Sequence, residues 1–187
     1  MRRRRMPSLI KTFLIAMLVA AVGVLAVAWW NRPPPAASDI DAKPLVAGVW
    51  ISEQVAPAQL PELASEGFKA VVDLRPNGEM AGQPSSDEVS EAAKRAGLAF
   101  SYVPVAHGDI AADSVAALDR ALSASGRPVL LYCRSGRRAA RTWALVEASR
   151  SGGLDADAIE AAVRSAGQSA DDLKQDISRR IAARAGH

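Results

Sequence analysis

The segment Val129–Arg141 constrains the fold of this chain more than any other part of the sequence. Four apolar residues that favour β-structure, Val129 to Tyr132, lead into Cys133, which is the single cysteine of the chain. A short loop with one glycine follows, and then an alanine-rich stretch that predicts a helix. In such a strand–loop–helix unit the loop amides converge at the amino end of the helix, where they bind anions.

Cys133 is the candidate nucleophile of this unit. The dipoles of the loop favour a thiolate over a thiol, and three arginines, Arg134, Arg137 and Arg138, add positive charge nearby. A thiolate beside an anion-binding loop can attack a phosphate ester or sulfane sulfur. The alternative, that Cys133 is only a small buried apolar residue, does not account for the arginine-rich loop that follows it. We therefore expect the active site here.

The cysteine and histidine counts exclude several kinds of site. One cysteine cannot form an internal disulfide, a two-cysteine redox motif or a cysteine-based zinc site. Only two histidines are present, His107 and His187, so we expect no metal site and no cofactor.

The distribution of charge argues against a nucleic-acid partner. The formal net charge is +3, but the first 38 residues hold six of the 23 basic residues and no acidic residue. The remainder therefore has 17 basic residues against 20 acidic ones. A folded part with this balance lacks the basic surface that nucleic-acid binding requires.

The N-terminal segment predicts a single transmembrane helix. Residues 1–12 hold a basic cluster and are expected in the cytoplasm, and residues 13–30 form an uncharged run of 18 residues that ends in two tryptophans. Residues 31–44 are proline-rich and predict a semi-rigid linker. The alternative is a signal peptide cleaved after Ala26-Val27-Ala28, but the apolar run is long for a signal. We favour an anchor in a bacterial inner membrane, with residues 45–187 forming a domain on the periplasmic side.

Residues 45–187 alternate between strand and helix patterns, which predicts an α/β domain with a mainly parallel sheet. Gly67 and Gly97 are expected to end helices, and Asp113 is placed to cap one. Asp73 and Arg75 are expected to pair at the end of a strand. The expected strands are residues 45–51, 68–74, 99–105 and 129–132, and the expected helices are residues 57–66, 86–96, 112–123, 138–149, 156–166 and 169–183.

Three stretches resemble a known family when they are taken together: Phe68–Glu79, Phe100–Val105 and the loop after Cys133. In order and spacing they are similar to the bacterial beta-lactamase hydrolase-like phosphatase domain, which is related to the dual-specificity tyrosine phosphatases. The resemblance covers about residues 45–183. It implies a tyrosine-phosphatase-like domain of three layers, a phospho-cysteine intermediate and a reaction without a metal or cofactor.

The resemblance also implies roles for individual residues. Cys133 corresponds to the nucleophile and Arg138 to the arginine that clamps the anion. The loop residues that would supply main-chain donors are Arg134, Ser135, Gly136 and Arg137. Related enzymes place a general acid on the loop that follows residues 104–105, where Asp109 is the first candidate, His107 the second and Asp113 the third.

The spacing of Cys133 and Arg138 leaves two further functions open. Tyrosine phosphatases have five residues between the cysteine and the arginine, whereas four separate them here. Such a loop is also similar to that of single-domain rhodaneses, in which Cys133 would carry a persulfide. The third hypothesis is a non-catalytic module that binds an anion or a partner. The expected partners are therefore a small phosphorylated or sulfur-donor substrate and, through residues 13–30, a membrane.

Overall fold

The structure is a computed structural model that describes residues 40–185 and the single residue Met17. Among these residues, no helix is both long and apolar enough to cross a membrane. The anchor expected at residues 13–30 lies outside the described residues apart from Met17, as does most of the linker at residues 31–44.

The described part of the chain alternates between strands and helices, as the sequence predicts. The strands are β1 (Lys43–Val46), β2 (Val49–Ser52), β3 (Ala70–Asp73), β4 (Ala99–Tyr102) and β5 (Val129–Tyr132). The helices are η1 (Pro57–Gln59), α2 (Leu60–Ser65), α3 (Ser86–Ala96), α4 (Ala112–Ala124), α5 (Arg137–Ser149), α6 (Ala156–Ser165), η2 (Asp171–Leu173) and α7 (Lys174–Ala185).

The sheet has the order β1-β2-β5-β3-β4 and is mainly parallel, which confirms the sequence prediction. Only the β1–β2 pair is antiparallel. The prediction of one continuous strand over residues 45–51 is wrong, because Gly48 adopts a φ of +76° and turns the chain back on itself. The central position of β5 places its carboxyl end, and therefore Cys133, in the middle of the sheet edge.

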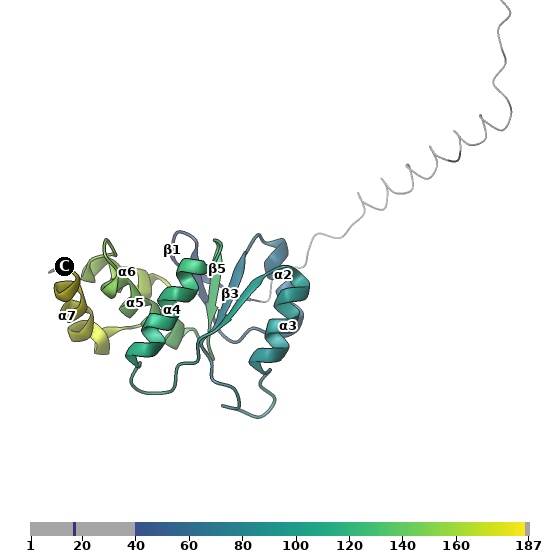
Figure 1. Cartoon of the computed structure of the whole chain (residues 1–187), viewed down its shortest axis with the longest axis horizontal. Coiled ribbons are helices and arrows are strands. Elements are labelled where there is room, and N and C mark those ends of the chain that lie inside the picture. Colours follow the sequence, from purple (N-terminus) through teal and green to yellow (C-terminus); the bar gives the residue numbers. More distant parts are fainter. Residues whose placement is uncertain (1–16, 18–39, 186–187) are drawn as a thin grey trace, which may run out of the picture. The chain divides into compact units, whose positions relative to one another are not determined.

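Helices cover both faces of the sheet and produce three layers (Figure 1). Residues of β5 alternate between the two faces: Leu131 joins the larger hydrophobic cluster, whereas Leu130 joins the smaller one. Helices α4, α5 and α6 contribute side chains to the larger cluster, and α2 and α3 contribute to the smaller one. This is the three-layer α/β architecture that the sequence indicates.

Helix boundaries follow local capping signals where such signals exist. Helix α3 begins and ends where predicted, because the Ser85 side chain accepts from the Glu88 amide and Gly97 ends the helix at a φ of +75°. Asp113 does not cap α4, in contrast to the prediction. The N-cap of α4 is Ala111, and Asp113 lies inside the first turn, where its charge still favours the helix dipole.

Helix α5 is buried on nearly all sides. Nine of its 13 residues are buried, including Ala139, Ala140 and Trp143. It packs against α4, α6 and α7. The small alanine side chains let these neighbours approach closely, so the first turn of α5, which follows the Cys133 loop, is held by packing from several directions.

Candidate active site

The loop between β5 and α5 has a backbone that only glycine accommodates at its centre. Gly136 is the N-cap of α5 and has a φ of +77°. A Cβ atom there would lie 3.3 Å from Gln168 Nε2 and 3.4 Å from the main-chain oxygen of Ser52. Gln168 also donates to the main-chain oxygen of Ser135 over 3.1 Å. Cys133 lies at the start of this loop and is 1% exposed.

Arg138 is held from two sides within the first turn of α5. Its side chain donates to the main-chain oxygen of Val105 over 2.7 Å and to Glu79 Oε2 over 2.8 Å. Burial opposes the positive charge, but the bonds to Glu79 and the attraction of Cys133 outweigh it and raise the pKa of Arg138. Arg138 is therefore a fixed cation beside the Cys133 side chain.

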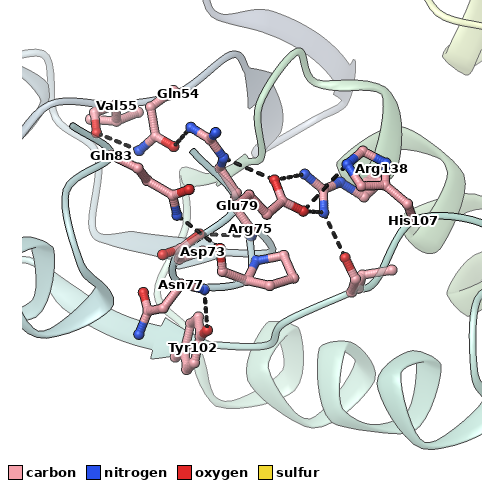
Figure 2. A network of polar contacts seen from close by, with 12 residues as sticks. Gln54, Val55, Asp73, Arg75, Asn77, Glu79, Gln83, Tyr102, His107 and Arg138 are labelled. Atoms are coloured by element: carbon pink, nitrogen blue, oxygen red, sulfur yellow. Dashed lines mark hydrogen bonds and ion pairs between the residues drawn. The ribbon is translucent and has the colours of Figure 1, made fainter. Parts of the chain in front are cut away.

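Glu79 is the site residue to which the sequence analysis assigns no role. Figure 2 shows its carboxylate between the guanidinium groups of Arg138 and Arg75, and Arg75 Nε donates to Glu79 Oε2 over 3.0 Å. Hydrogen bonds from Arg138 lower the pKa of Glu79 to about 2, against the effect of burial, and Arg75 contributes to the shift. Only one feature of the sequence points to Glu79 as a site residue: it is the last residue of the stretch 68–79, and that stretch is one of the three that resemble the family.

Asp73 and Arg75 pair at the end of β3, as expected, but through the main chain of Arg75 and not through its guanidinium. Asp73 Oδ1 accepts from the main-chain amide of Arg75 over 2.8 Å, whereas the guanidinium of Arg75 binds Glu79 and Gln54. Burial raises the pKa of Asp73, although the amide bond from Arg75 opposes this shift. Asp73 therefore turns the chain at the end of β3 and leaves Arg75 free to reach Glu79.

Hydrogen bonds from Asn77 hold the loop that carries Glu79 against β4 and α3. The main-chain amide of Asn77 donates to the hydroxyl of Tyr102 over 2.9 Å (Figure 2). The side chain of Asn77 donates to Ser86 Oγ over 2.9 Å and accepts from the Ser86 amide over 2.8 Å. These bonds fix the loop between β3 and α3, so Glu79 reaches Arg138 from an anchored segment.

A cleft of about 520 Å³ opens above the Cys133 loop. Its lining includes Arg134, Ser135, Arg137 and Arg138 from the loop and the first turn of α5. The lining also includes His107, Gly108 and Asp109 from the segment between β4 and α4. Asp113, the third candidate acid, does not line the cleft. The structure therefore brings Arg138, three of the four predicted loop residues and the first two candidate acids to one cavity. Gly136 lines a separate pocket, and Cys133 is buried and does not line the cleft.

Two further features describe the surroundings of the site. His107 is exposed, and its Nε2 atom lies 3.5 Å from Glu79 Oε1 (Figure 2). Among residues 40–185, no group of three or more histidine, cysteine, aspartate or glutamate side chains is placed to hold a metal ion. The arginines and the exposed Asp109 side chain that line the cleft, together with Cys133 next to Arg134 in sequence, are compatible with attack by a thiolate on a bound anion.

Comparison with known proteins identifies the family. Residues 41–150 match the family described as beta-lactamase hydrolase-like protein, phosphatase-like domain. The chain belongs to this family. A beta-lactamase hydrolase-like protein of Xylella fastidiosa is 39% identical over 98 residues, which are 52% of this chain and 22% of that protein. A relative from Agrobacterium fabrum is 33% identical over 91 residues, or 49% of this chain and 21% of that protein. The chain thus spans about a fifth of the length of these curated relatives.

Solved structures agree with this family assignment. A protein from Neisseria meningitidis, provisionally described as a phosphatase, superposes with a TM-score of 0.65 and 26% identity, over 74% of this chain and 96% of that one. A kinase associated phosphatase in which the catalytic cysteine is replaced by serine gives a TM-score of 0.60 at 14% identity, over 80% and 99% of the two chains. The fold is therefore that of the tyrosine and dual-specificity phosphatases.

This member of the beta-lactamase hydrolase-like phosphatase family extends its site beyond the matched residues. Gln168, which binds the Cys133 loop, and Asp172, which lines the cleft, both follow residue 150. No motif in the sequence marks either residue as part of the site. Their positions depend on how α6 and α7 pack against α5.

Proposed function

We propose that this chain is a membrane-anchored, cysteine-dependent hydrolase of phosphate monoesters that forms a phosphorylated Cys133 intermediate. The observation that carries the proposal is the meeting of the Cys133 loop, Arg138 and Asp109 at one cleft. The family match and the phosphatase fold support the same class of reaction.

The proposed reaction has two steps. The Cys133 thiolate attacks phosphorus, so that an S–P bond forms and the P–O bond to the leaving group breaks. Arg138 and the loop amides stabilise the non-bridging oxygens, and Asp109 gives its proton to the leaving oxygen. Water then attacks the phospho-cysteine, Asp109 accepts the proton of that water, and inorganic phosphate and the thiolate are released.

Glu79 serves as a positioning residue in this mechanism and not as the acid. With a pKa of about 2 it carries no proton to donate near neutral pH. Its two carboxylate oxygens bind both terminal nitrogens of Arg138 and so fix the plane of the guanidinium. A fixed guanidinium loses less entropy when it binds the phosphate oxygens, which favours the transition state.

The test of this function compares leaving groups. Asp109→Asn should lower the turnover of an alkyl phosphate by about 10²-fold or more, because an alkoxide leaves poorly without a proton. It should affect a nitrophenyl phosphate less, since nitrophenolate is a stable anion. Asp113→Asn is the matched control, because Asp113 lies nearby but outside the cleft. If Asp109→Asn changes neither activity while the wild-type chain hydrolyses both esters, Asp109 is not the acid, and His107→Ala is the next variant to measure.

The spacing of Cys133 and Arg138 favours a second candidate function, sulfur transfer. In that reaction Cys133 accepts sulfane sulfur from thiosulfate, sulfite leaves without needing a proton, and cyanide takes the sulfur from the persulfide. The full-length chain should therefore also be assayed with thiosulfate and cyanide. Robust thiocyanate formation together with no hydrolysis of any phosphate ester would refute the phosphatase proposal.

The proposed location is the periplasmic side of a bacterial inner membrane. The basic cluster before the uncharged run at residues 13–30 supports a cytoplasmic N-terminus and an exported domain. A periplasm-active reporter fused to the C-terminus should be active and should sediment with membranes. Reporter activity in the soluble fraction, with the first 28 residues removed, would indicate a cleaved signal peptide instead.

A further inference from the structure

The cleft holds more positive charge than a single phosphate group requires. Four arginines line it, against the two aspartates Asp109 and Asp172. Arg138 is already paired with Glu79. Arg134 and Arg137 are exposed, and no ion pair links them to another described residue. One phosphate can be held by Arg138 and the loop amides, so the remaining arginines need another explanation.

Arg141 is the most constrained of these additional arginines. Its side chain is only 11% exposed, and it pairs with Asp172, which lies in η2 and is 52% exposed. Its Nε atom is buried and has no hydrogen-bond partner among the described residues. Leaving a buried donor without a partner is unfavourable, so a ligand acceptor that reaches it would be favourable. The ion pair with Asp172 engages Nη2 of Arg141 and leaves its Nε–H without an acceptor among the described residues.

The position of Arg141 on α5 relates it to the proposed catalytic centre. Arg138 and Arg141 are three residues apart on one helix, and Arg137 and Arg141 are four apart. Residues at these spacings are neighbours on a helix surface, with Cβ atoms about 5–6 Å apart. An anion at Arg141 and Arg137 would therefore lie about one helical turn from a phosphate held by Arg138.

We propose that the substrate is a small phosphate monoester that carries a second anionic group, which Arg141 and Arg137 bind. Asp172 acts as the resident counter-ion of Arg141 and is displaced when that group enters. A cleft of about 520 Å³ has the size of a small-molecule site. This proposal rests on the proposed function and specifies its substrate class.

The experiment measures binding without turnover, in the full-length chain with Cys133→Ser. Its ligands are 4-hydroxybutyl phosphate and butane-1,4-diyl bisphosphate, which differ by one phosphate, and calorimetry is done at fixed ionic strength. The bisphosphate should bind roughly tenfold more tightly, because the second phosphate gains charge-assisted hydrogen bonds. Since two identical ends by themselves give a factor of about two, a preference no larger than this would overturn the proposal.

Second variants distinguish a ligand-binding Arg141 from a purely structural one. Arg141→Gln should reduce the preference for the bisphosphate to the statistical factor, whereas Asp172→Asn should increase it several-fold by removing the competing carboxylate. The matched control is Arg164→Gln, because Arg164 is an exposed helical arginine with an ion pair outside the cleft. If Asp172→Asn and Arg141→Gln lower the preference equally, the pair is structural and the proposal fails.

Turnover by the wild-type chain separates this proposal from the proposed function. If no phosphate monoester is hydrolysed but the bisphosphate preference and its response to Arg141→Gln are observed, the second anion site stands and the hydrolase assignment falls. If monoesters are hydrolysed and no preference is measured, the hydrolase stands and the second site falls.

Discussion

Replacing Glu79 by glutamine should remove a part of the folding stability that depends on pH. The Glu79 carboxylate lies between Arg75 and Arg138 and is 13% exposed, and its pKa falls from 4.5 to about 2. Each tenfold change in proton affinity corresponds to about 1.4 kcal/mol, so this fall corresponds to at most about 3.5 kcal/mol. Solvent screening of an ion pair at the edge of a cleft reduces the expected value to about 1.5 kcal/mol.

The direction of the pH effect follows from the lowered pKa. A carboxyl group with a lower pKa in the folded state stabilises the protein fully above its unfolded-state pKa, here about 4.5. The contribution is lost as the pH falls towards 2. The wild-type chain should therefore lose stability over this range relative to Glu79→Gln, whose side chain does not titrate. More than half of the difference should already be gone at pH 3.

Urea unfolding of both proteins at pH 7, 5, 4 and 3 measures this difference directly. Subtracting the two free energies of unfolding at each pH cancels the titration of the other carboxyl groups. Glu91→Gln is the control, because Glu91 is exposed and forms no ion pair among the described residues. A difference between wild type and Glu79→Gln that stays constant from pH 7 to pH 3 would refute the assigned role of the ion pair.

Three other measurements test the loop and its support. Alkylation of Cys133 should be slowed several-fold by phosphate, and a rate indifferent to anions would contradict an anion site at the loop. Gly136→Ala should lower the free energy of unfolding in urea by about 1–2 kcal/mol, because its φ of +77° disfavours a Cβ atom; unchanged stability would contradict this. Arg184→Met should lower the melting temperature by about 4–8 °C and Arg179→Met by much less, since Arg184 donates to four main-chain oxygens. Those oxygens belong to Glu147, Arg150, Gly153 and Leu154.

The sequence predicts the parts of this fold that depend on local signals. The boundaries of α3 follow from Ser85, Glu88 and Gly97, and β5 follows from an apolar run that ends at a polar loop. The hairpin at residues 43–52 was missed because its strands are short and Gly48 alone marks the turn. The β-propensity of residues 43–52 is the same whether they form one long strand or two short strands that pair with each other.

The candidate site could be predicted only where its residues lie close together in sequence. Cys133 and Arg138 lie five positions apart in one strand–loop–helix unit, so their proximity follows from that pattern. Glu79 is 59 residues from Arg138, and Asp172 is 31 residues from Arg141. These contacts arise because β3 lies beside β5 and because α7 packs on α5. Such pairings are properties of the assembled sheet and helices, which single-sequence patterns do not encode.

The extensive burial of α5 has a consequence for how the parts of the cleft respond to substrate. Amide protons in a helix so enclosed should exchange with solvent only when the whole domain unfolds, so the wall that carries Arg138 should be the most protected part of the molecule. The segment with His107, Gly108 and Asp109 is exposed, so its amides should exchange through small local openings. Any adjustment to different ligands would then fall on the segment with His107, Gly108 and Asp109, while the first turn of α5 keeps one geometry.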